Sequence, residues 1–118
     1  MTPKKIVVTG IGATSPLGGT APDSWAALLA GESGAHTLAH EWVAQYDLPV
    51  TFAAEAKVRP EDVLERVEYK RLDPSSQFAL ISAREAWADA GAPDVDPIRV
   101  GVDYSTGIDG LWTLLDAW

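Results

Sequence analysis

The chain has 118 residues, of which 47% are hydrophobic, and its formal net charge at pH 7 is −8. This length suits one domain with one core, and the apolar fraction is ordinary for a globular protein rather than a disordered one. The negative charge argues against general nucleic-acid binding, because the phosphate backbone would repel the chain as a whole. The sequence contains no cysteine, which excludes disulfides and a thiolate nucleophile within it. It also shows no membrane-spanning run and no signal peptide, so we expect a cytoplasmic protein with no membrane partner.

A short apolar strand followed by a glycine-rich loop opens the chain. Residues 6–8 are three consecutive β-branched aliphatic residues, a pattern typical of a strand covered on both faces by helices. Residues 10–19 contain four glycines, which interrupt regular structure and allow the backbone to pass close to another element. Strand, glycine-rich loop and helix follow one another in many α/β enzymes. A dinucleotide-binding turn is the alternative, but Ser15 stands where its GxGxxG pattern needs the third glycine.

A short helix is predicted after this loop. Thr20 is a candidate N-cap with an acidic residue three positions later, and Gly31 is placed to end the helix. Apolar side chains at helical spacing predict one buried face, formed by Trp25, Leu28 and Leu29. Residues 32–48 are expected to form a surface excursion, and residues 49–54 a brief strand.

The clearest predicted helix begins after Asp73, a favourable N-cap, with Pro74 at its first position. Gly91 and Pro93 end it. Its many alanines would allow close approach to a neighbouring element, so we expect this helix to be buried.

One or two helical turns are expected over residues 61–66, and a strand over residues 98–104, where apolar and polar residues alternate. The last predicted helix carries an apolar stripe of Leu111, Leu114, Leu115 and Trp118, and the sequence stops within it.

The chain resembles the condensing enzymes, and more narrowly the elongating, type II β-ketoacyl-acyl-carrier-protein synthases. Four blocks carry the resemblance in family order: residues 6–19, which include Thr-Gly-Ile-Gly and Ser-Pro-Leu-Gly, and residues 24–34, 71–80 and 99–108. Residues 36–51 match loosely. The resemblance implies an α/β fold, the N-terminal part of a thiolase-like layered αβαβα fold. We therefore expect residues 1–118 to be the N-terminal segment of a β-ketoacyl synthase domain, truncated within its last helix.

The resemblance implies an enzyme that condenses acyl thioesters with malonyl-acyl-carrier-protein in fatty-acid elongation, as a homodimer and without a cofactor. A polyketide-type ketosynthase and a non-catalytic partner subunit similar to chain-length factors remain alternatives. In the family a cysteine takes the acyl chain and two histidines assist the condensation. All three lie C-terminal to the segment matched here. No catalytic residue is therefore assigned, and this chain alone is expected to be inactive.

One local cluster of basic residues stands out in this acidic chain: Arg66, Lys70 and Arg71. Arg66 and Lys70 are four residues apart and would share a face if this segment is helical. Because acyl carrier proteins are strongly acidic, the resemblance implies that the cluster helps to dock one. Val67 stands where elongating synthases often carry another basic residue. The alternative is a solvated turn in which these residues pair with Glu65 and Glu68.

The resemblance also implies that Ile108 lies beside the acyl pocket, where its rotamer opens or blocks the path of the chain. Asp109 replaces the glycine usual in the family's loop. A carboxylate buried unpaired beside an apolar pocket is costly, so we expect Asp109 to turn outward as a helix N-cap.

Two further candidate sites are weaker. His36 and His40 have the spacing of a helical pair near Glu41, but the stretch is a poor helix candidate and offers no clear third ligand, so we interpret both as surface histidines and predict no metal site. Ser15 and Ser105 have no base at a recognisable spacing, which leaves serine catalysis unsupported.

Overall fold

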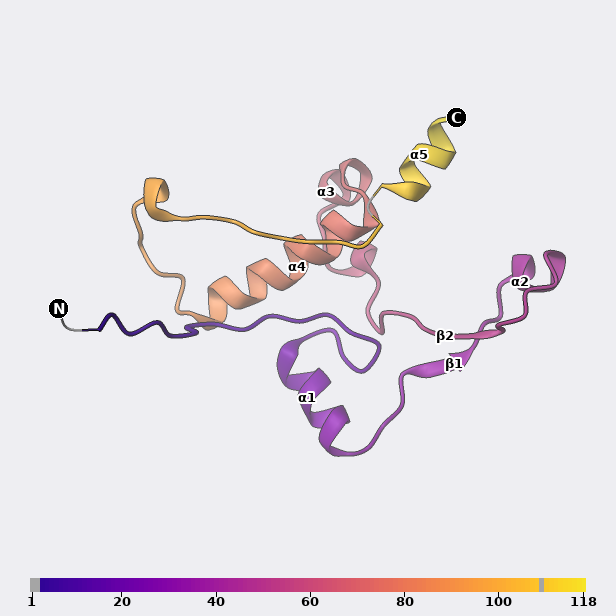
Figure 1. The fold of residues 1–118 in the computed structure, drawn as a ribbon, viewed down its shortest axis with the longest axis horizontal. Helices are drawn as coiled ribbons and strands as arrows, with labels where there is room; N and C mark the ends of the chain where they lie inside the picture. Colours follow the sequence, from indigo (N-terminus) through magenta and orange to yellow (C-terminus); the bar gives the residue numbers. More distant parts are fainter. Residues whose placement is uncertain (1–2, 109) are drawn as a thin grey trace. The chain divides into compact units, whose positions relative to one another are not determined.

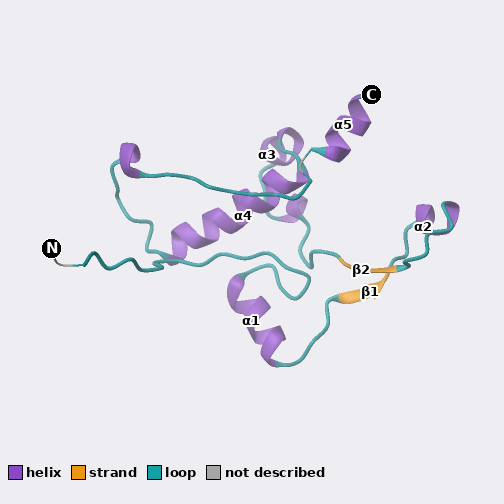
Figure 2. Cartoon of the chain, in the orientation of Figure 1, coloured by secondary structure: helices purple, strands orange, loops and turns teal. Residues whose placement is uncertain are grey.

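The computed structural model describes residues 3–108 and 110–118. The chain divides into two compact units, Thr14–Arg59, here called the hairpin unit, and the helical unit, which combines the residues up to Ala13 with Pro60–Trp118. Figures 1 and 2 show helices joined by long irregular segments, with one small sheet. In chain order the elements are α1 (Ala21–Leu29), β1 (Ala35–Thr37), α2 (Glu41–Gln45), β2 (Phe52–Ala54), the 3-10 helix η1 (Pro60–Asp62), α3 (Arg66–Arg71), α4 (Pro74–Asp89), the 3-10 helix η2 (Pro97–Arg99) and α5 (Leu111–Ala117).

Helix α1 begins and ends as its sequence predicts. The Thr20 side chain accepts a hydrogen bond from the backbone N–H of Asp23, which satisfies one donor of the first turn. Gly31 adopts a φ of +73°, and the N–H groups of Gly31 and Glu32 return to the carbonyls of Leu28 and Ala27. This is a Schellman ending, which needs a left-handed residue and so favours glycine.

The buried face predicted for α1 is not observed. Trp25, Leu28 and Leu29 are exposed, whereas Ala27 is buried. Helical spacing identifies a face that is suited to burial, but burial also requires a surface to cover that face. Within the described part of the hairpin unit no element covers it.

The strand expected within residues 49–54 is confirmed as β2, which pairs antiparallel with β1. The register places Ala35 opposite Ala54 and Thr37 opposite Phe52. The surface excursion expected over residues 32–48 therefore contains both a strand and the short helix α2.

Helix α4 also starts and ends as predicted. Asp73 accepts hydrogen bonds from the backbone N–H and the hydroxyl of Ser75, and Gly91, with a φ of +81°, closes a second Schellman ending. Burial is confined to part of the helix, at Gln77 and Ile81.

The glycine-rich segment crosses α4 at close range within the helical unit. A Cβ atom on Gly10 or Gly12 would lie 2.1 Å or 2.0 Å from a carbonyl oxygen of α4, those of Ala86 and Ser82 respectively. The backbone N–H of Ala13 donates to Glu85 Oε2 at 2.8 Å. The predicted close passage of these glycines along another element is therefore confirmed, and the small side chains of α4 permit it.

Two predicted strands are not observed. Residues 6–8 and 98–104 make no strand pairing in the described structure, and η2 occupies residues 97–99. Their side chains are largely solvent-exposed, with Ile6 at 96% and Val102 at 92%. Alternating and β-branched patterns indicate a fit to a buried sheet surface, but a strand also needs a hydrogen-bonded neighbour. Neither segment has one among the described residues.

Within residues 3–108 and 110–118, no helix combines the length and the apolar character that crossing a membrane requires.

Candidate functional site

Helix α3 carries the three basic residues singled out by the sequence. The helix was expected over residues 61–66, but the chain forms a 3-10 turn at Pro60–Asp62 and begins the α-helix at Arg66. Arg66 and Lys70 consequently lie one helical turn apart on a common face, and Arg71 follows at the end of the helix. All three side chains are exposed.

Gln77 of α4 holds the C-terminal end of α3. Its side chain is buried, at 6% exposure, and its Nε2 donates to the carbonyl oxygens of Tyr69 at 2.8 Å and Leu72 at 2.9 Å. One buried amide thus satisfies two carbonyls that α3 leaves without helical partners. The sequence alone does not reveal this residue, because a glutamine inside a helix gives no local sign of an interhelical role.

Glu68, in the first turn of α3, and Arg84 join the N-terminal end of α3 to α4. The Arg84 guanidinium donates to both carboxylate oxygens of Glu68, at 2.9 Å and 2.5 Å. The same carboxylate accepts the backbone N–H of Glu65 at 3.3 Å. The hydrogen bonds from Arg84 lower the pKa of Glu68, and Glu68 raises the pKa of Arg84.

This pairing changes the interpretation of the basic cluster. Sequence reasoning left open a solvated turn in which Arg66, Lys70 and Arg71 pair with the neighbouring glutamates. Instead, the carboxylate of Glu68, the one acidic side chain within α3, is occupied by Arg84. Among the described residues the three basic side chains have no ion pair. They are therefore available to an acidic partner.

Ile108 borders a hollow of 260 Å³ at the start of α4 and α5. The hollow is lined by Asp73, Pro74, Ser75, Ile108, Gly110 and Leu111. Ile108 itself is exposed. Thr113 of α5 donates to Asp73 Oδ2 at 2.8 Å, so the N-cap of α4 also binds α5. Asp109 lies outside the described residues, and α5 begins after Gly110, which is its N-cap with a φ of +68°.

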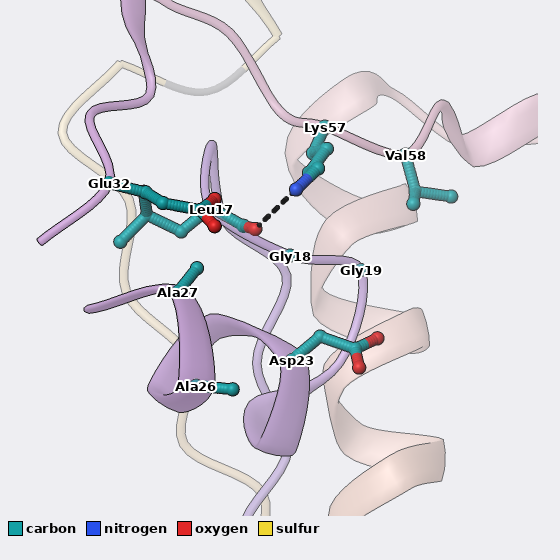
Figure 3. A pocket seen from close by; sticks show the side chains of 9 residues that line it. All are labelled: Leu17, Gly18, Gly19, Asp23, Ala26, Ala27, Glu32, Lys57 and Val58. Carbon is teal, nitrogen blue, oxygen red and sulfur yellow. Dashed lines mark hydrogen bonds between the residues drawn. The ribbon is translucent and has the colours of Figure 1, made fainter. Parts of the chain in front are cut away.

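The glycine-rich loop, α1 and residues 57–58 line a second, open hollow of 390 Å³ in the hairpin unit (Figure 3). The Lys57 ammonium donates to the Leu17 carbonyl at 3.1 Å across its rim. Gly19 lies against Val58, whose Cγ2 would be 2.5 Å from a Cβ built on the glycine. In the loop, Ser15 Oγ accepts the N–H groups of Leu17 and Gly18 and lies 2.7 Å from Ser24 Oγ. These contacts give Ser15 a role in shaping the turn.

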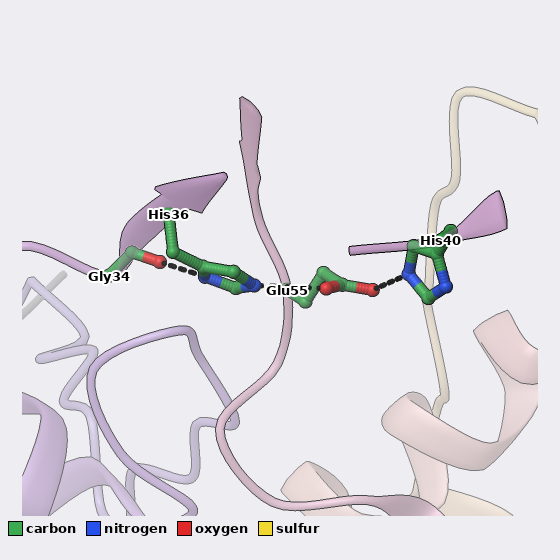
Figure 4. A network of polar contacts seen from close by, with 4 residues as sticks. All are labelled: Gly34, His36, His40 and Glu55. Atoms are coloured by element: carbon green, nitrogen blue, oxygen red, sulfur yellow. Dashed lines mark hydrogen bonds and ion pairs between the residues drawn. The ribbon is translucent and has the colours of Figure 1, made fainter. Parts of the chain in front are cut away.

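His36 and His40 are both surface residues, but the structure joins them through a carboxylate that the sequence analysis did not select. His36 lies on β1, His40 is the N-cap residue of α2, and Glu55 follows β2. The Nε2 atoms of His36 and His40 lie 3.0 Å and 2.9 Å from the two Glu55 oxygens (Figure 4). The described residues contain no group of three or more His, Cys, Asp or Glu side chains arranged to hold a metal ion.

The sequence model of the family described as "Beta-ketoacyl synthase, N-terminal domain" matches residues 3–116. The chain belongs to the β-ketoacyl synthase family. The resemblance seen in the sequence is thereby confirmed. The family implies a thiolase-like fold, and helices accompanied by few strands fit part of such a domain.

Three curated proteins similar to this β-ketoacyl synthase segment carry the name 3-oxoacyl-[acyl-carrier-protein] synthase 2. The protein from Coxiella burnetii is 38% identical over 114 residues, which cover 94% of this chain and 27% of the relative. Those from Mycobacterium bovis and Mycobacterium tuberculosis are 34% identical over 103 residues, or 87% of this chain and 25% of each relative. The chain thus spans about a quarter of the length of these relatives.

Proposed function

We propose that this chain is the N-terminal part of a 3-oxoacyl-acyl-carrier-protein synthase, a transferase that condenses acyl thioesters with malonyl-acyl-carrier-protein in fatty-acid elongation. The observation that carries the proposal is the family match over residues 3–116, together with relatives of that name aligned over most of the chain. The complete protein would act in the cytoplasm as a homodimer and bind acyl carrier protein.

In this proposal the chain supplies binding surfaces and leaves the bond-forming chemistry to other residues. Condensation needs a nucleophile that accepts the acyl chain and donors that stabilise the enolate charge. The sequence contains no cysteine, so it lacks the nucleophile that the family uses. Arg66, Lys70 and Arg71 would attract the acidic carrier protein. Ile108, beside the hollow at the start of α5, would contact the acyl chain.

A chimera tests the proposal directly. Residues 3–116 would replace the matched segment of the Coxiella burnetii synthase, and the product would be incubated with acyl- and malonyl-acyl-carrier-protein. We expect a β-ketoacyl product from the chimera and none from the 118-residue chain by itself. A folded chimera that binds neither carrier protein nor substrate would contradict the proposal, as would product formed by the isolated chain.

The nucleotide sequence that follows the Trp118 codon separates the alternatives. A cysteine in a turn of small residues, followed by two histidine motifs, would support a condensing enzyme. A continuing family sequence without that cysteine would favour the non-catalytic partner subunit.

A further inference from the structure

Three segments of the hairpin unit meet at one carboxylate. Glu55, at the end of β2, binds His36 of β1 through Oε2 and His40 of α2 through Oε1. We call these three side chains the histidine clasp (Figure 4). Glu55 lies 19 and 15 residues from its two partners in the sequence. The clasp therefore joins the strands to the start of α2 through two side-chain contacts, in addition to the backbone pairing of β1 with β2.

The ring of His36 lies between two acceptors. Its Nε2 faces the Glu55 carboxylate at 3.0 Å, and its Nδ1 faces the Gly34 carbonyl oxygen at 3.3 Å. A neutral imidazole carries one N–H, so it can donate to only one of these acceptors, and its other nitrogen would direct a lone pair at an oxygen. An imidazolium donates to both. The observed geometry is therefore complete only when His36 is protonated.

His40 differs from His36 in this respect. Its Nε2 lies 2.9 Å from Glu55, and its ring stacks on Trp42 with the planes 12° apart. A neutral ring with the proton on Nε2 satisfies this contact. A neutral His36 therefore loses one of its two contacts, whereas a neutral His40 can keep its contact with Glu55.

The charged surroundings agree with a protonated His36. The hydrogen bond to Glu55, then that to the Gly34 carbonyl, raises the pKa of His36, and the two histidines lower the pKa of Glu55. The clasp lines an open hollow of 800 Å³, whose other charged residues are Glu32, Lys57 and Arg59, and Glu41 adjoins His40 in α2. Lys57 directs its ammonium at the Leu17 carbonyl. The charge that raises the pKa of His36 is that of the Glu55 carboxylate.

We propose that the histidine clasp stabilises the hairpin unit in a pH-dependent way. It holds β1, β2 and the start of α2 together while His36 is an imidazolium. When His36 loses its proton, one of its two contacts is lost and residues 35–55 open more often. His36 has a raised pKa, so its contribution is complete below about 6.5 and is lost as the pH rises through its higher folded value. Glu55 has a lowered pKa, so its contribution is present above about 4.5 and is lost as the pH falls through its lower folded value.

The test is an NMR titration of the dilute 118-residue chain from pH 4 to pH 9, with amide exchange measured in parallel. The chain has two histidines, so a His40→Gln variant assigns both rings. We expect both ring nitrogens of His36 to carry protons at pH 6.5, its pKa to exceed 6.5, and the protection of the β1 and β2 amides to fall as it deprotonates. Exchange rates are corrected for base catalysis, so the change reports opening.

Glu55→Gln keeps the size and one acceptor oxygen but removes the charge. We expect it to lower the pKa of His36 towards its ordinary value and to remove the pH dependence of strand protection. Glu41→Gln is the matched control and should change neither quantity, because Glu41 makes no contact with the His36 ring. Titration of wild-type His36 at or below 6.5, or an unchanged profile in Glu55→Gln, would overturn the proposal.

Discussion

Gly12 lies so close to Ser82 of α4 that a Cβ atom built on the glycine would be 2.0 Å from the Ser82 carbonyl oxygen. That contact is with backbone, which cannot move aside as a flexible side chain can. The backbone N–H groups on either side of Gly12, those of Ile11 and Ala13, donate to the side chains of Asp89 and Glu85 of the same helix. Glycine at this position therefore allows the N-terminal segment to be hydrogen-bonded along α4.

Gly12→Ala should separate the N-terminal segment from α4. We expect a loss of about 1–3 kcal/mol in the free energy of unfolding, the usual cost of overpacking. Urea denaturation of the dilute chain measures it. Gly101→Ala is the control, since no atom lies within 4 Å of its added Cβ, and it should stay within about 0.5 kcal/mol of wild type. Equal stability of the two variants would contradict the close crossing.

The Glu68–Arg84 pair predicts a specific acid sensitivity of α3. Glu68 has a lowered pKa, so its contribution to stability is present above about 4.5 and is lost as the pH falls through the lower folded value. Glu68→Gln should therefore be less stable than wild type at pH 7, with the difference shrinking below pH 4.5. Urea midpoints measured from pH 7 to pH 3 test this.

Asp103→Asn is the control for this titration, because Asp103 is exposed and makes no ion pair among the described residues. A wild-type advantage over Glu68→Gln that stays constant down to pH 3 would show that the pair does not couple to protonation.

Helix ends were predictable from sequence because their causes are local. Thr20, Gly31, Asp73 and Gly91 each act within a few residues of their own position, and the structure confirms all four. Strand pairing is a non-local property. Residues 6–8 have the composition of a strand but no hydrogen-bonded neighbour in the described structure, so a correct local pattern produced a wrong prediction.

In the candidate sites, too, local features were predictable from the sequence and non-local contacts were not. Spacing placed Arg66 and Lys70 on one helical face, which α3 confirms. The residues that position or complete the sites, Gln77, Arg84 and Glu55, come from other elements, 5 to 19 residues away in the sequence. No periodicity links them to their partners. The one available signal was charge: Arg84 is the lone basic residue in the sequence of α4.

Charge reversal at the basic cluster tests carrier-protein docking, which depends on the proposed function. In the chimera described above, combined replacement of Arg66, Lys70 and Arg71 by Glu should slow association with acyl carrier protein roughly 10-fold or more, because steering by exposed charges is lost. Added salt should slow the wild-type chimera and have little effect on the variant. Stopped-flow fluorescence measures both rates.

The matched control for the docking test replaces Lys4, Lys5 and Arg99 by Glu. These residues are exposed, and the control has the same net charge as the cluster variant. It separates a local docking effect from a general change in the field of the protein. If both triple variants slow association equally, the cluster has no special role, and it is a solvated face.

The apolar stripe of α5 should make the isolated chain associate with itself. Leu111, Leu114 and Leu115 are exposed to 45%, 63% and 56%, as expected for a stripe without a covering surface. Contiguous apolar patches of this kind are interaction or aggregation sites, and unpaired strand-like segments such as residues 6–8 add to the tendency. We expect light scattering to show oligomers whose size grows with concentration, and weak amide protection near Leu114.

Combined replacement of the three leucines of α5 by Gln should shift the chain towards monomer, since it removes the apolar surface and keeps residues that favour helix. Val67→Gln, which also replaces an exposed apolar side chain but lies on α3, is the control and should leave association unchanged. Amide exchange near Leu114 then separates two outcomes. A monodisperse wild-type monomer with cooperative unfolding and strong protection there would show that the 118 residues form a self-sufficient domain whose α5 stripe needs no cover. Concentration-dependent oligomers that the three replacements dissolve would show that the stripe itself drives association.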